Sequence, residues 1–318
     1  MNLSDVPGDD LPRLRIAGRI AADFLLRVVR TVAGPRDLTD TLILVATVQA
    51  NVSPILRDPA LQRAYASLDA PPPEHLRRPI SVNAVAGSLG LPFETVRRRI
   101  GILSAAGACT VTARGVVVPE LQLNTPEHCE LLSENLRQVR ELYRQLRWAG
   151  CLEPAAETPD PLTAPPVRAV ARVSSEYALR MVEPIVGYLG DLTDGFLLMA
   201  ILDLNTRHLP TLTGPDIDPG YVADSLRKPA AVGEIAKALG LGYELTRRRL
   251  KRLAQAGLCE IAPAGVVVPI ASLIRPGGLD FMVANLTNLR RMFASLAPLG
   301  ITQAWEVEQN RELRALAS

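Results

Sequence analysis

Residues 79–119 read PISVNAVAGSLGLPFETVRRRIGILSAAGACTVTARGVVVP, and residues 229–269 read PAAVGEIAKALGLGYELTRRRLKRLAQAGLCEIAPAGVVVP. The two stretches align without a gap, with nearly half of their positions identical. Internal repetition on this scale predicts that one structural unit occurs twice in the chain. Both copies carry three consecutive arginines at the same place, Arg97 to Arg99 in the first and Arg247 to Arg249 in the second.

Composition limits the class of protein. The chain has 318 residues, enough for two domains that each bury a core. Hydrophobic residues make up 48% and charged residues 21%, which is typical of a folded globular protein. Aromatic residues are scarce at 4%, which disfavours stacking on single-stranded nucleic acid. The formal net charge is only +2, so any binding of nucleic acid requires a local basic patch.

The repeat extends beyond its well-matched core and sets the predicted domain boundaries. The sequence DLTD occurs at 37–40 and again at 191–194, each time before an apolar run with helical spacing. Downstream, both copies continue into an amphipathic helical stretch. We therefore expect copy 1 at residues 14–150 and copy 2 at 167–318. The segment 151–166 is rich in proline and reads as a semi-rigid linker.

The repeat core predicts two helices followed by a hairpin. In the first copy Ser81 is a good N-cap, Gly90 breaks the first helix, and Pro92 can begin the second. Helical spacing directs one stripe of the second helix inward: Val96, Ile100 and Leu103. The opposite side carries Glu94, Arg97, Arg98 and Gly101. After Gly107, ACTVT and GVVVP alternate as two short strands joined by a turn at 113–115.

Helix, tight turn, helix and hairpin is the order of a winged helix-turn-helix. On SLGLPFETVRRRIGILSAAG and ALGLGYELTRRRLKRLAQAG the chain resembles the bacterial MarR-like and GntR-like transcription regulators. The resemblance implies a mainly α fold with small β-hairpin wings and two tandem winged helix-turn-helix domains. The flanking helices resemble MarR-like dimerisation helices, which implies an intramolecular pseudo-dimer. The chain departs from the winged helix-turn-helix pattern at Pro92 and Gly242, which replace the usual hydroxyl residue that caps the second helix.

Arginine chemistry indicates which residues would contact DNA. A helix in the major groove needs base-reading side chains near its N-terminal turns and cations for the flanking phosphates. The guanidinium fork can bond guanine bidentately or hold phosphate oxygens. We therefore expect the leading contacts from four residues: Arg97, Arg98, Arg247 and Arg248. Possible base or backbone partners are Thr95, Glu94, Tyr243 and Glu244.

The remaining basic residues have less direct predicted roles. Arg99 and Arg249 lie nearer the helix flank, so we expect them to contact phosphate or to form intramolecular ion pairs. Lys251 and Arg252 extend the basic face of the second copy. Arg114 at the first wing tip, where the second copy has Ala264, could reach a minor groove. These differences predict two half-sites that are not identical.

Each of these residues also has a purely structural interpretation. A run of arginines on a helix is often only a solvated face. Phe93 and Tyr243 fit packing better than base contact, and Cys109 and Cys259 fit small buried thiols. Asn51 and Asn205, near the ends of the two apolar runs, fit residues that satisfy backbone groups.

Three functions remain open at this stage. The first is a sequence-specific regulator of transcription that binds double-stranded DNA at an imperfect two-part site. The second is a winged-helix scaffold for protein interactions. The third is a ligand-gated regulator with a pocket between winged core and flanking helices, whose effector the sequence does not name. The long loops near 57–78 and 208–227 are candidates for regulation.

Other functional classes are disfavoured. The sequence lacks GxGxxG, GxxxxGK[ST], HExxH and GxSxG, and its three histidines share no metal-ligand spacing. We therefore expect no enzyme activity, no cofactor and no metal. No signal peptide is evident and the longest apolar stretch is short, which indicates a cytoplasmic protein without a membrane partner. We expect a monomer acting as a pseudo-dimer, with a homodimer as the alternative.

Overall fold

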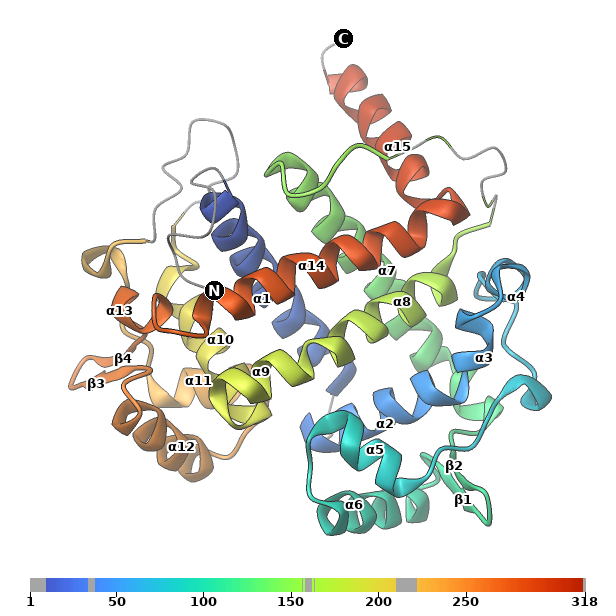
Figure 1. The fold of residues 1–318 in the computed structure, drawn as a ribbon, viewed down its shortest axis with the longest axis horizontal. Helices are drawn as coiled ribbons and strands as arrows, with labels where there is room; N and C mark the ends of the chain where they lie inside the picture. Colours follow the sequence, from blue (N-terminus) through green and yellow to red (C-terminus); the bar gives the residue numbers. More distant parts are fainter. Residues whose placement is uncertain are drawn as a thin grey trace. The chain divides into compact units, whose positions relative to one another are not determined.

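The computed structural model describes residues 10–33, 38–155, 157, 162, 164–209 and 222–316 (Figure 1). These residues are mainly helical, with two antiparallel two-stranded sheets. The predicted class, mainly α with small β-hairpins, is therefore confirmed at this level. The chain divides into two compact units. Unit 1 is drawn from Met1–Leu38, Arg144–Leu152 and Met181–Thr287, and unit 2 from Thr39–Tyr143, Glu153–Arg180 and Asn288–Ser318.

Unit 2 contains the first repeat core. Its helices before and within that core are α2 (Leu38–Asn51), α3 (Ser53–Leu56), α4 (Pro59–Ala64), η2 (Glu74–Leu76), α5 (Val82–Leu89) and α6 (Phe93–Ala105). The hairpin follows as β1 (Thr110–Thr112) and β2 (Gly115–Val117). The unit is completed by η3 (Glu120–Leu123), most of α7 (Pro126–Trp148), α8 (Val167–Arg180), the end of α14 (Gly278–Leu296), η5 (Ala297–Leu299) and α15 (Ile301–Leu316).

Unit 1 contains the second repeat core. It begins with α1 (Asp10–Ala33) and continues with α9 (Val182–Leu189), α10 (Leu192–Thr206), η4 (Asp224–Leu226), α11 (Val232–Leu239) and α12 (Tyr243–Gln255). Its hairpin is β3 (Glu260–Ala262) with β4 (Gly265–Val267). The short helix α13 (Ile270–Leu273) and the first half of α14 follow.

The compact units do not coincide with the sequence repeats 14–150 and 167–318, because each unit includes the first long helix of the other repeat. In unit 1, α1 lies against α10 and α11, and the Arg30 guanidinium donates to the Ala238 carbonyl at 3.0 Å. In unit 2, the Arg168 backbone N–H of α8 donates to the Ala66 carbonyl at 2.9 Å. Each unit is therefore assembled from both repeats.

The two repeat cores fold alike. In each, a tight turn joins two helices, and a left-handed glycine ends the first helix, Gly90 at φ 60° and Gly240 at φ 65°. The predicted Ser81 cap is confirmed, since its hydroxyl accepts from the Ala84 N–H at 3.1 Å. The second copy has Ala231 there, and the Glu234 carboxylate accepts from the Ala231 N–H at 3.1 Å instead.

The inward stripe of the second core helix is also confirmed. Val96, Ile100 and Leu103 are all buried in α6. In α12 a threonine takes the place of Val96, and Thr246 is fully buried. Its hydroxyl donates to the Gly242 carbonyl one turn back at 3.1 Å, so the burial leaves no orphaned polar group.

A third backbone segment supports each hairpin. Ile80, which precedes α5, forms an isolated antiparallel bridge with Val116 of β2. Ala230, which precedes α11, forms the same bridge with Val266 of β4. This pairing explains the glycine at the start of β2: a Cβ on Gly115, at φ 130°, would lie 2.4 Å from the Ile80 carbonyl oxygen. The equivalent Gly265 has φ 134° and faces Ala230 in the same way.

Two further findings concern the whole described chain. No single described helix has the length and apolar composition of a membrane span; the bent helix pair Val167–Leu189 and Leu192–Thr206 passes that test only when taken together. All four cysteines are unpaired, and Cys109 and Cys259 are buried as predicted. Burial, together with the nearby Glu260 carboxylate, raises the pKa of Cys259 to about 11, so this thiol stays protonated at neutral pH.

Candidate nucleic-acid interface

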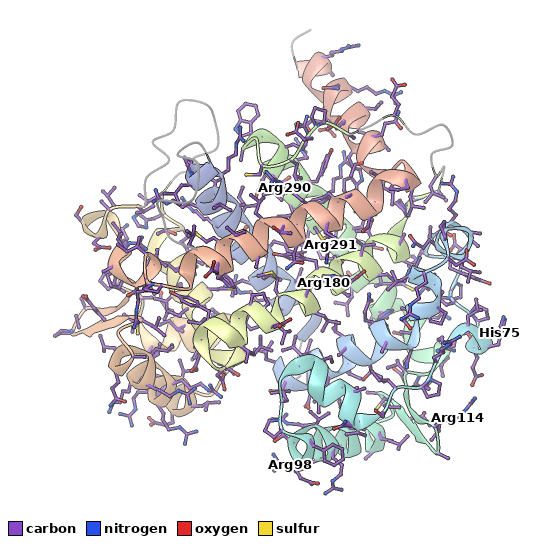
Figure 2. The ribbon with its side chains drawn as sticks, in the orientation of Figure 1. His75, Arg98, Arg114, Arg180, Arg290 and Arg291 are labelled. Carbon is purple, nitrogen blue, oxygen red and sulfur yellow. The ribbon has the colours of Figure 1, made fainter. Side chains whose placement is uncertain are left out.

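The outward faces of α6 and α12 carry the first two arginines of each triplet. Arg97, Arg98, Arg247 and Arg248 are all exposed. Figure 2 shows Arg98 on the outer side of α6 and Arg114 at the hairpin of the same unit. The amphipathic spacing of these helices produces this arrangement, because the buried stripe fixes the opposite face toward solvent.

Arg97 and Arg247 each have a local carboxylate partner. The Arg97 guanidinium lies 2.9 Å from Glu94, and that of Arg247 lies 2.9 Å from Glu244. All four side chains are largely exposed, and such i,i+3 pairs contribute little to stability. A phosphate or a guanine edge could therefore replace the glutamate at low free-energy cost.

Arg98 and Arg248 differ from their neighbours. Within the described residues neither guanidinium has a hydrogen bond or an ion pair, and the same is true of the exposed Lys251 ammonium in α12. Arg114 is exposed at the β1–β2 turn, where its backbone N–H donates to the Thr112 hydroxyl at 3.2 Å. The side chains of these four cations have no partner within the described part of the chain, so they can bond to another molecule.

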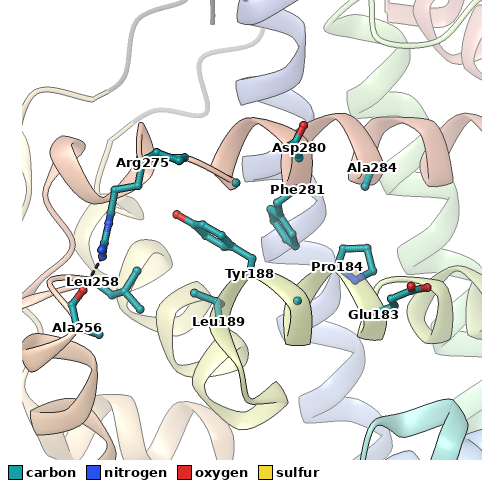
Figure 3. A pocket seen from close by; sticks show the side chains of 13 residues that line it. Glu183, Pro184, Tyr188, Leu189, Ala256, Leu258, Arg275, Asp280, Phe281 and Ala284 are labelled. Carbon is teal, nitrogen blue, oxygen red and sulfur yellow. Dashed lines mark hydrogen bonds between the residues drawn. The ribbon is translucent and has the colours of Figure 1, made fainter. Parts of the chain in front are cut away.

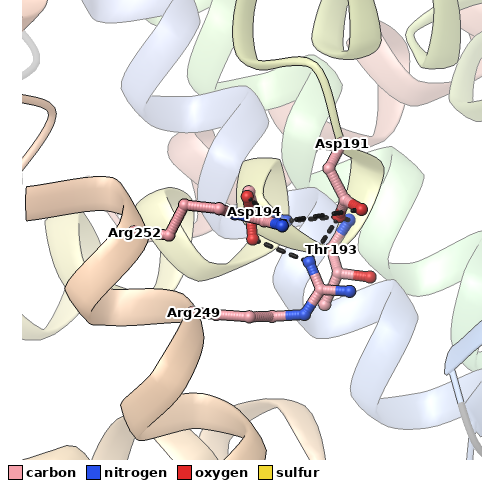
Figure 4. A network of polar contacts seen from close by, with 5 residues as sticks. All are labelled: Asp191, Thr193, Asp194, Arg249 and Arg252. Atoms are coloured by element: carbon pink, nitrogen blue, oxygen red, sulfur yellow. Dashed lines mark hydrogen bonds and ion pairs between the residues drawn. The ribbon is translucent and has the colours of Figure 1, made fainter. Parts of the chain in front are cut away.

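The third arginine of each triplet faces inward toward the preceding long helix. The Arg99 guanidinium lies 3.1 Å from the Asp40 carboxylate of α2. In unit 1 the Arg249 guanidinium lies 2.7 Å from Asp191 and 2.8 Å from Asp194 (Figure 4). Of the two roles predicted for Arg99 and Arg249, the structure shows the intramolecular ion pair.

Arg252 joins the same network. Its guanidinium forms an ion pair with Asp194, whose side chain is only 4% exposed (Figure 4). Asp191 also caps α10, because its carboxylate accepts from the backbone N–H groups of Thr193 and Asp194 at 2.8 and 3.1 Å. Arg252 was predicted to extend the contact face. It remains 57% exposed, but one side of its guanidinium is occupied by the protein itself.

These ion pairs have a signal in the sequence that the prediction did not use. The DLTD motif stands at the start of the apolar helix of both repeats, and an arginine triplet follows it in each repeat. Its last aspartate, Asp40 or Asp194, is the residue that binds the third arginine. The occurrence of the same acid and the same base in both copies is the sequence signal for this contact.

The aromatic residues at the start of α6 and α12 are not buried, although the sequence favoured a packing role for them. Phe93 is 43% exposed and Tyr243 is 54% exposed, so the expectation that they pack into the core is wrong. Pro92 and Gly242 are the N-cap residues of α6 and α12, and neither provides a side-chain cap hydrogen bond. Thr95 is half-buried, beside the outward arginines of α6.

Asn51 and Asn205 satisfy backbone groups, as predicted, and these groups lie in and beside the hairpins. The Asn205 side-chain amide donates to the carbonyls of Lys228 and Val266 at 2.7 and 3.0 Å and accepts from the Val268 N–H at 3.0 Å. Asn51 makes the same three bonds in the first repeat, at 2.7, 3.1 and 3.0 Å. One buried amide thus satisfies three backbone groups and joins the long helix to the hairpin.

The first long loop, 57–78, is held by two buried arginines of α8. The Arg168 guanidinium donates to the Leu68 carbonyl at 2.9 Å, and Arg172 donates to the Tyr65 carbonyl at 2.8 Å. Burial and the neighbouring Arg168 lower the pKa of Arg172 to about 10. This loop is therefore a docking site for α8. Of the second loop, 208–227, residues 210–221 lie outside the described part of the chain.

Unit 1 contains a cavity of about 850 Å³ beside the second repeat core (Figure 3). Its walls are α9, the end of α12 with the following residue Leu258, and the start of α14. The sequence does not indicate which residues line it, because their convergence depends on tertiary packing. Among the described residues no group of three or more His, Cys, Asp or Glu side chains could hold a metal ion.

Comparison with known proteins gives no relative. The chain matches no protein-family model, no curated protein and no solved structure. The resemblance to winged helix-turn-helix regulators therefore depends on the quoted repeat residues, and the interface depends on the geometry described above.

Proposed function

We propose that the protein is a sequence-specific regulator of transcription that binds double-stranded DNA, with α6 and α12 as two recognition helices of tandem winged helix-turn-helix modules. The observation that carries this proposal is the division of roles within both arginine triplets. In each, the third arginine binds an aspartate of the long helix before the repeat core, α2 or α10, while the first two are exposed. If the arginines formed only a solvated face, two diverged copies would not need to retain one paired arginine and two exposed arginines.

The exposed residues have the chemistry that a DNA groove requires. Arg98 and Arg248 have no protein partner among the described residues, so their forks can bond guanine O6 and N7 or two phosphate oxygens. The partly buried ion pairs of Arg99 and Arg249 attach the same helices to α2 and α10. A recognition helix needs this combination of a fixed backbone and free side chains, because an ordered reader loses less conformational entropy on binding.

The two modules would read different half-sites. The first has Arg114 at its hairpin turn and a glycine at position 101 of its helix. The second has Ala264 at the hairpin and Lys251 on the helix. We therefore propose an imperfect two-part site, in which Arg114 reaches a groove beside the first half and Lys251 contacts phosphate beside the second.

The test is selection of genomic DNA fragments by the purified chain, followed by fluorescence anisotropy on the selected sequence. The Arg98→Ala/Arg248→Ala protein should lose affinity by about 30-fold or more, since each lost bidentate contact is worth ~1–3 kcal/mol. The matched control is Arg291→Ala/Arg311→Ala, which removes the same charge from exposed positions of α14 and α15. Equal losses in both double variants would show only a general charge effect and would contradict the proposal.

A protein-interaction scaffold is the second candidate, because apolar side chains accompany the arginines. Ile102 of α6 and the paired hairpin positions Val111 and Ile261 are about half exposed. Exposed aliphatic groups at equivalent hairpin positions favour a protein surface over a phosphate backbone. If the folded protein enriches no DNA, this second function replaces the first.

A further inference from the structure

The first turn of each proposed recognition helix contains an exposed carboxylate. Glu94 is the second residue of α6, and Glu244 is the second residue of α12. Their side chains are 71% and 74% exposed. Side chains near the N-terminus of a recognition helix are the ones that meet base edges in the major groove. Both carboxylates therefore stand among the side chains that the proposed function places against DNA.

The two glutamates occupy equivalent positions, although the residues around them differ between the copies. Pro92, Phe93 and Thr95 of the first copy correspond to Gly242, Tyr243 and Leu245 of the second. A carboxylate on a DNA-facing helix lowers the affinity for every DNA sequence, because the phosphate backbone is also negative. Its occurrence in both copies is therefore unfavourable for general affinity and is explained by a contribution to the choice of sequence.

Each carboxylate uses only one of its oxygens within the protein. Glu94 Oε2 accepts from the Arg97 Nε–H at 2.9 Å. Glu244 Oε2 accepts from the Nε–H and an Nη–H of Arg247, at 3.0 and 2.9 Å. Within the described part of the chain, Oε1 of each glutamate accepts no hydrogen bond, and neither carboxylate bonds to a backbone N–H of its helix. Each Glu–Arg pair thus keeps one available carboxylate oxygen beside a guanidinium.

This combination of acceptor and donor matches a C·G base pair. In the major groove cytosine presents an amino donor at N4, and guanine presents the acceptors O6 and N7. A carboxylate accepts from cytosine N4, and a guanidinium donates to guanine. Thymine has the acceptor O4 where cytosine has its amino group, so thymine and a carboxylate repel each other.

We propose that Glu94 and Glu244 are specificity-determining residues, each of which accepts a hydrogen bond from the N4 amino group of one cytosine in its own half-site. The proposal rests on the proposed DNA-binding function and adds the base that each module selects. On cytosine the carboxylate makes a charge-assisted hydrogen bond, and on other sequences it only repels phosphate. Specificity is the difference between these two affinities.

The variants Glu94→Gln and Glu244→Gln serve as controls for each other. Glutamine has the same shape as glutamate but carries both a donor and an acceptor, so it bonds cytosine N4 or thymine O4. Genomic DNA fragments are selected with the unmodified chain. Each C·G pair of the selected site is then replaced by T·A, one pair at a time, and affinities are measured by fluorescence anisotropy.

The expected result is one altered base pair in each half-site. At one C·G pair of the first half-site, replacement by T·A should weaken the unmodified chain by at least about tenfold and the Glu94→Gln chain by less than about threefold. Glu244→Gln should keep the full loss at that pair and lose its discrimination at one pair of the second half-site instead.

Affinity for random-sequence DNA supplies a second readout with the opposite sign. In Glu94→Gln/Glu244→Gln it should rise by about threefold or more, because both arginines lose a competing partner and phosphate no longer meets a carboxylate. Glu130→Gln/Glu183→Gln removes the same charge from exposed positions of α7 and α9 and should leave this affinity nearly unchanged.

Three results would overturn the proposal: equal discrimination against T·A in the unmodified chain and both glutamine variants, half-sites without a sensitive C·G pair, or weaker binding of random DNA by the double variant. A lower melting temperature of the glutamine variants with unchanged base choice would assign the glutamates to helix stability and would also overturn it. Each of these results leaves DNA binding itself intact. A folded chain that selects no DNA would instead refute the proposed function, and this proposal with it.

Discussion

Replacing Asn205 by alanine should destabilise unit 1 strongly. The residue is fully buried at the end of α10 and makes three hydrogen bonds of 2.7 to 3.0 Å to the backbone around the hairpin. Each bond contributes about 1 kcal/mol net, so the three together contribute about 3 kcal/mol. The alanine also leaves the Val268 N–H and the Lys228 carbonyl without their side-chain partner. We expect a loss of about 3 kcal/mol, roughly a hundredfold in the unfolding equilibrium.

Two measurements check this number. Urea unfolding followed by circular dichroism gives the change in free energy, and hydrogen exchange of peptides covering β3 and β4 reports the hairpin itself. Asn51→Ala is the twin variant, because its three bonds have nearly the same lengths in the first repeat. Asn83→Ala, at an exposed position of α5, is the control and should change stability by less than about 0.5 kcal/mol.

The reasoning is refuted if Asn205→Ala changes the free energy of unfolding by less than about 1 kcal/mol, because three buried hydrogen bonds cannot then be joining helix and hairpin. It is also refuted if Asn51→Ala and Asn205→Ala give very different losses. Because both asparagines make the same three hydrogen bonds, their replacement should lower the free energy of unfolding by similar amounts. Faster exchange in the β1–β2 peptides for Asn51→Ala, and in the β3–β4 peptides for Asn205→Ala, would assign each effect to its own unit.

Other substitutions test the glycines, the half-buried His128 and the arginine triplet. Gly265→Ala should lower the free energy of unfolding by about 3 kcal/mol, because a Cβ at φ 134° would lie 2.7 Å from a carbonyl oxygen. Gly101→Ala, on the open surface of α6, should raise the free energy of unfolding by about 0.5–1 kcal/mol. Equal effects of the two variants in thermal unfolding would contradict the close approach at Gly265. Burial, with a nearby arginine, lowers the pKa of His128 to about 4, and an unfolded histidine titrates near 6.5. Because the unfolded state binds the extra proton, stability should be full above about pH 6.5 and fall toward pH 4, and His128→Gln should remove that part of the pH dependence in urea titrations. Arg249→Ala should lower the melting temperature, because it breaks an ion pair with the buried Asp194 carboxylate. Arg248→Ala should leave the melting temperature unchanged and weaken only DNA binding, measured by fluorescence anisotropy. The reverse pattern would refute the roles assigned to the two arginines.

Local sequence signals predict the repeat cores well. The Ser81 cap, the left-handed Gly90, the buried stripe of α6 and the two strands all follow from short-range spacing. The outward arginines follow from the same spacing, since 100° per residue determines the exposed face once the buried face is known. The roles of Asn51 and Asn205 are predicted because a buried amide must find partners.

Tertiary packing decides what the local signals miss. The packing interpretation of Phe93 and Tyr243 follows from aromatic character, which favours burial, but both residues are exposed at the start of their helices. The ion pairs of Asp191 and Asp194 with Arg252 join residues about 60 positions apart and have no counterpart in the first copy, so no local signal indicates them. The exchange of first helices has no local signal, since an amphipathic helix does not encode which core it covers.

The exchanged helices bear on how the chain can fold as it is synthesised. Many multidomain proteins complete their N-terminal domain first, while later residues are still being made. Here α1 contacts α10 and α11, so residues near the N-terminus must wait until residues 192–239 have been made. Unit 2, in turn, includes α8 and α15. Neither unit can be completed from the first half of the chain alone. The apolar faces of helices in the first repeat therefore stay exposed to solvent until the second half has been synthesised.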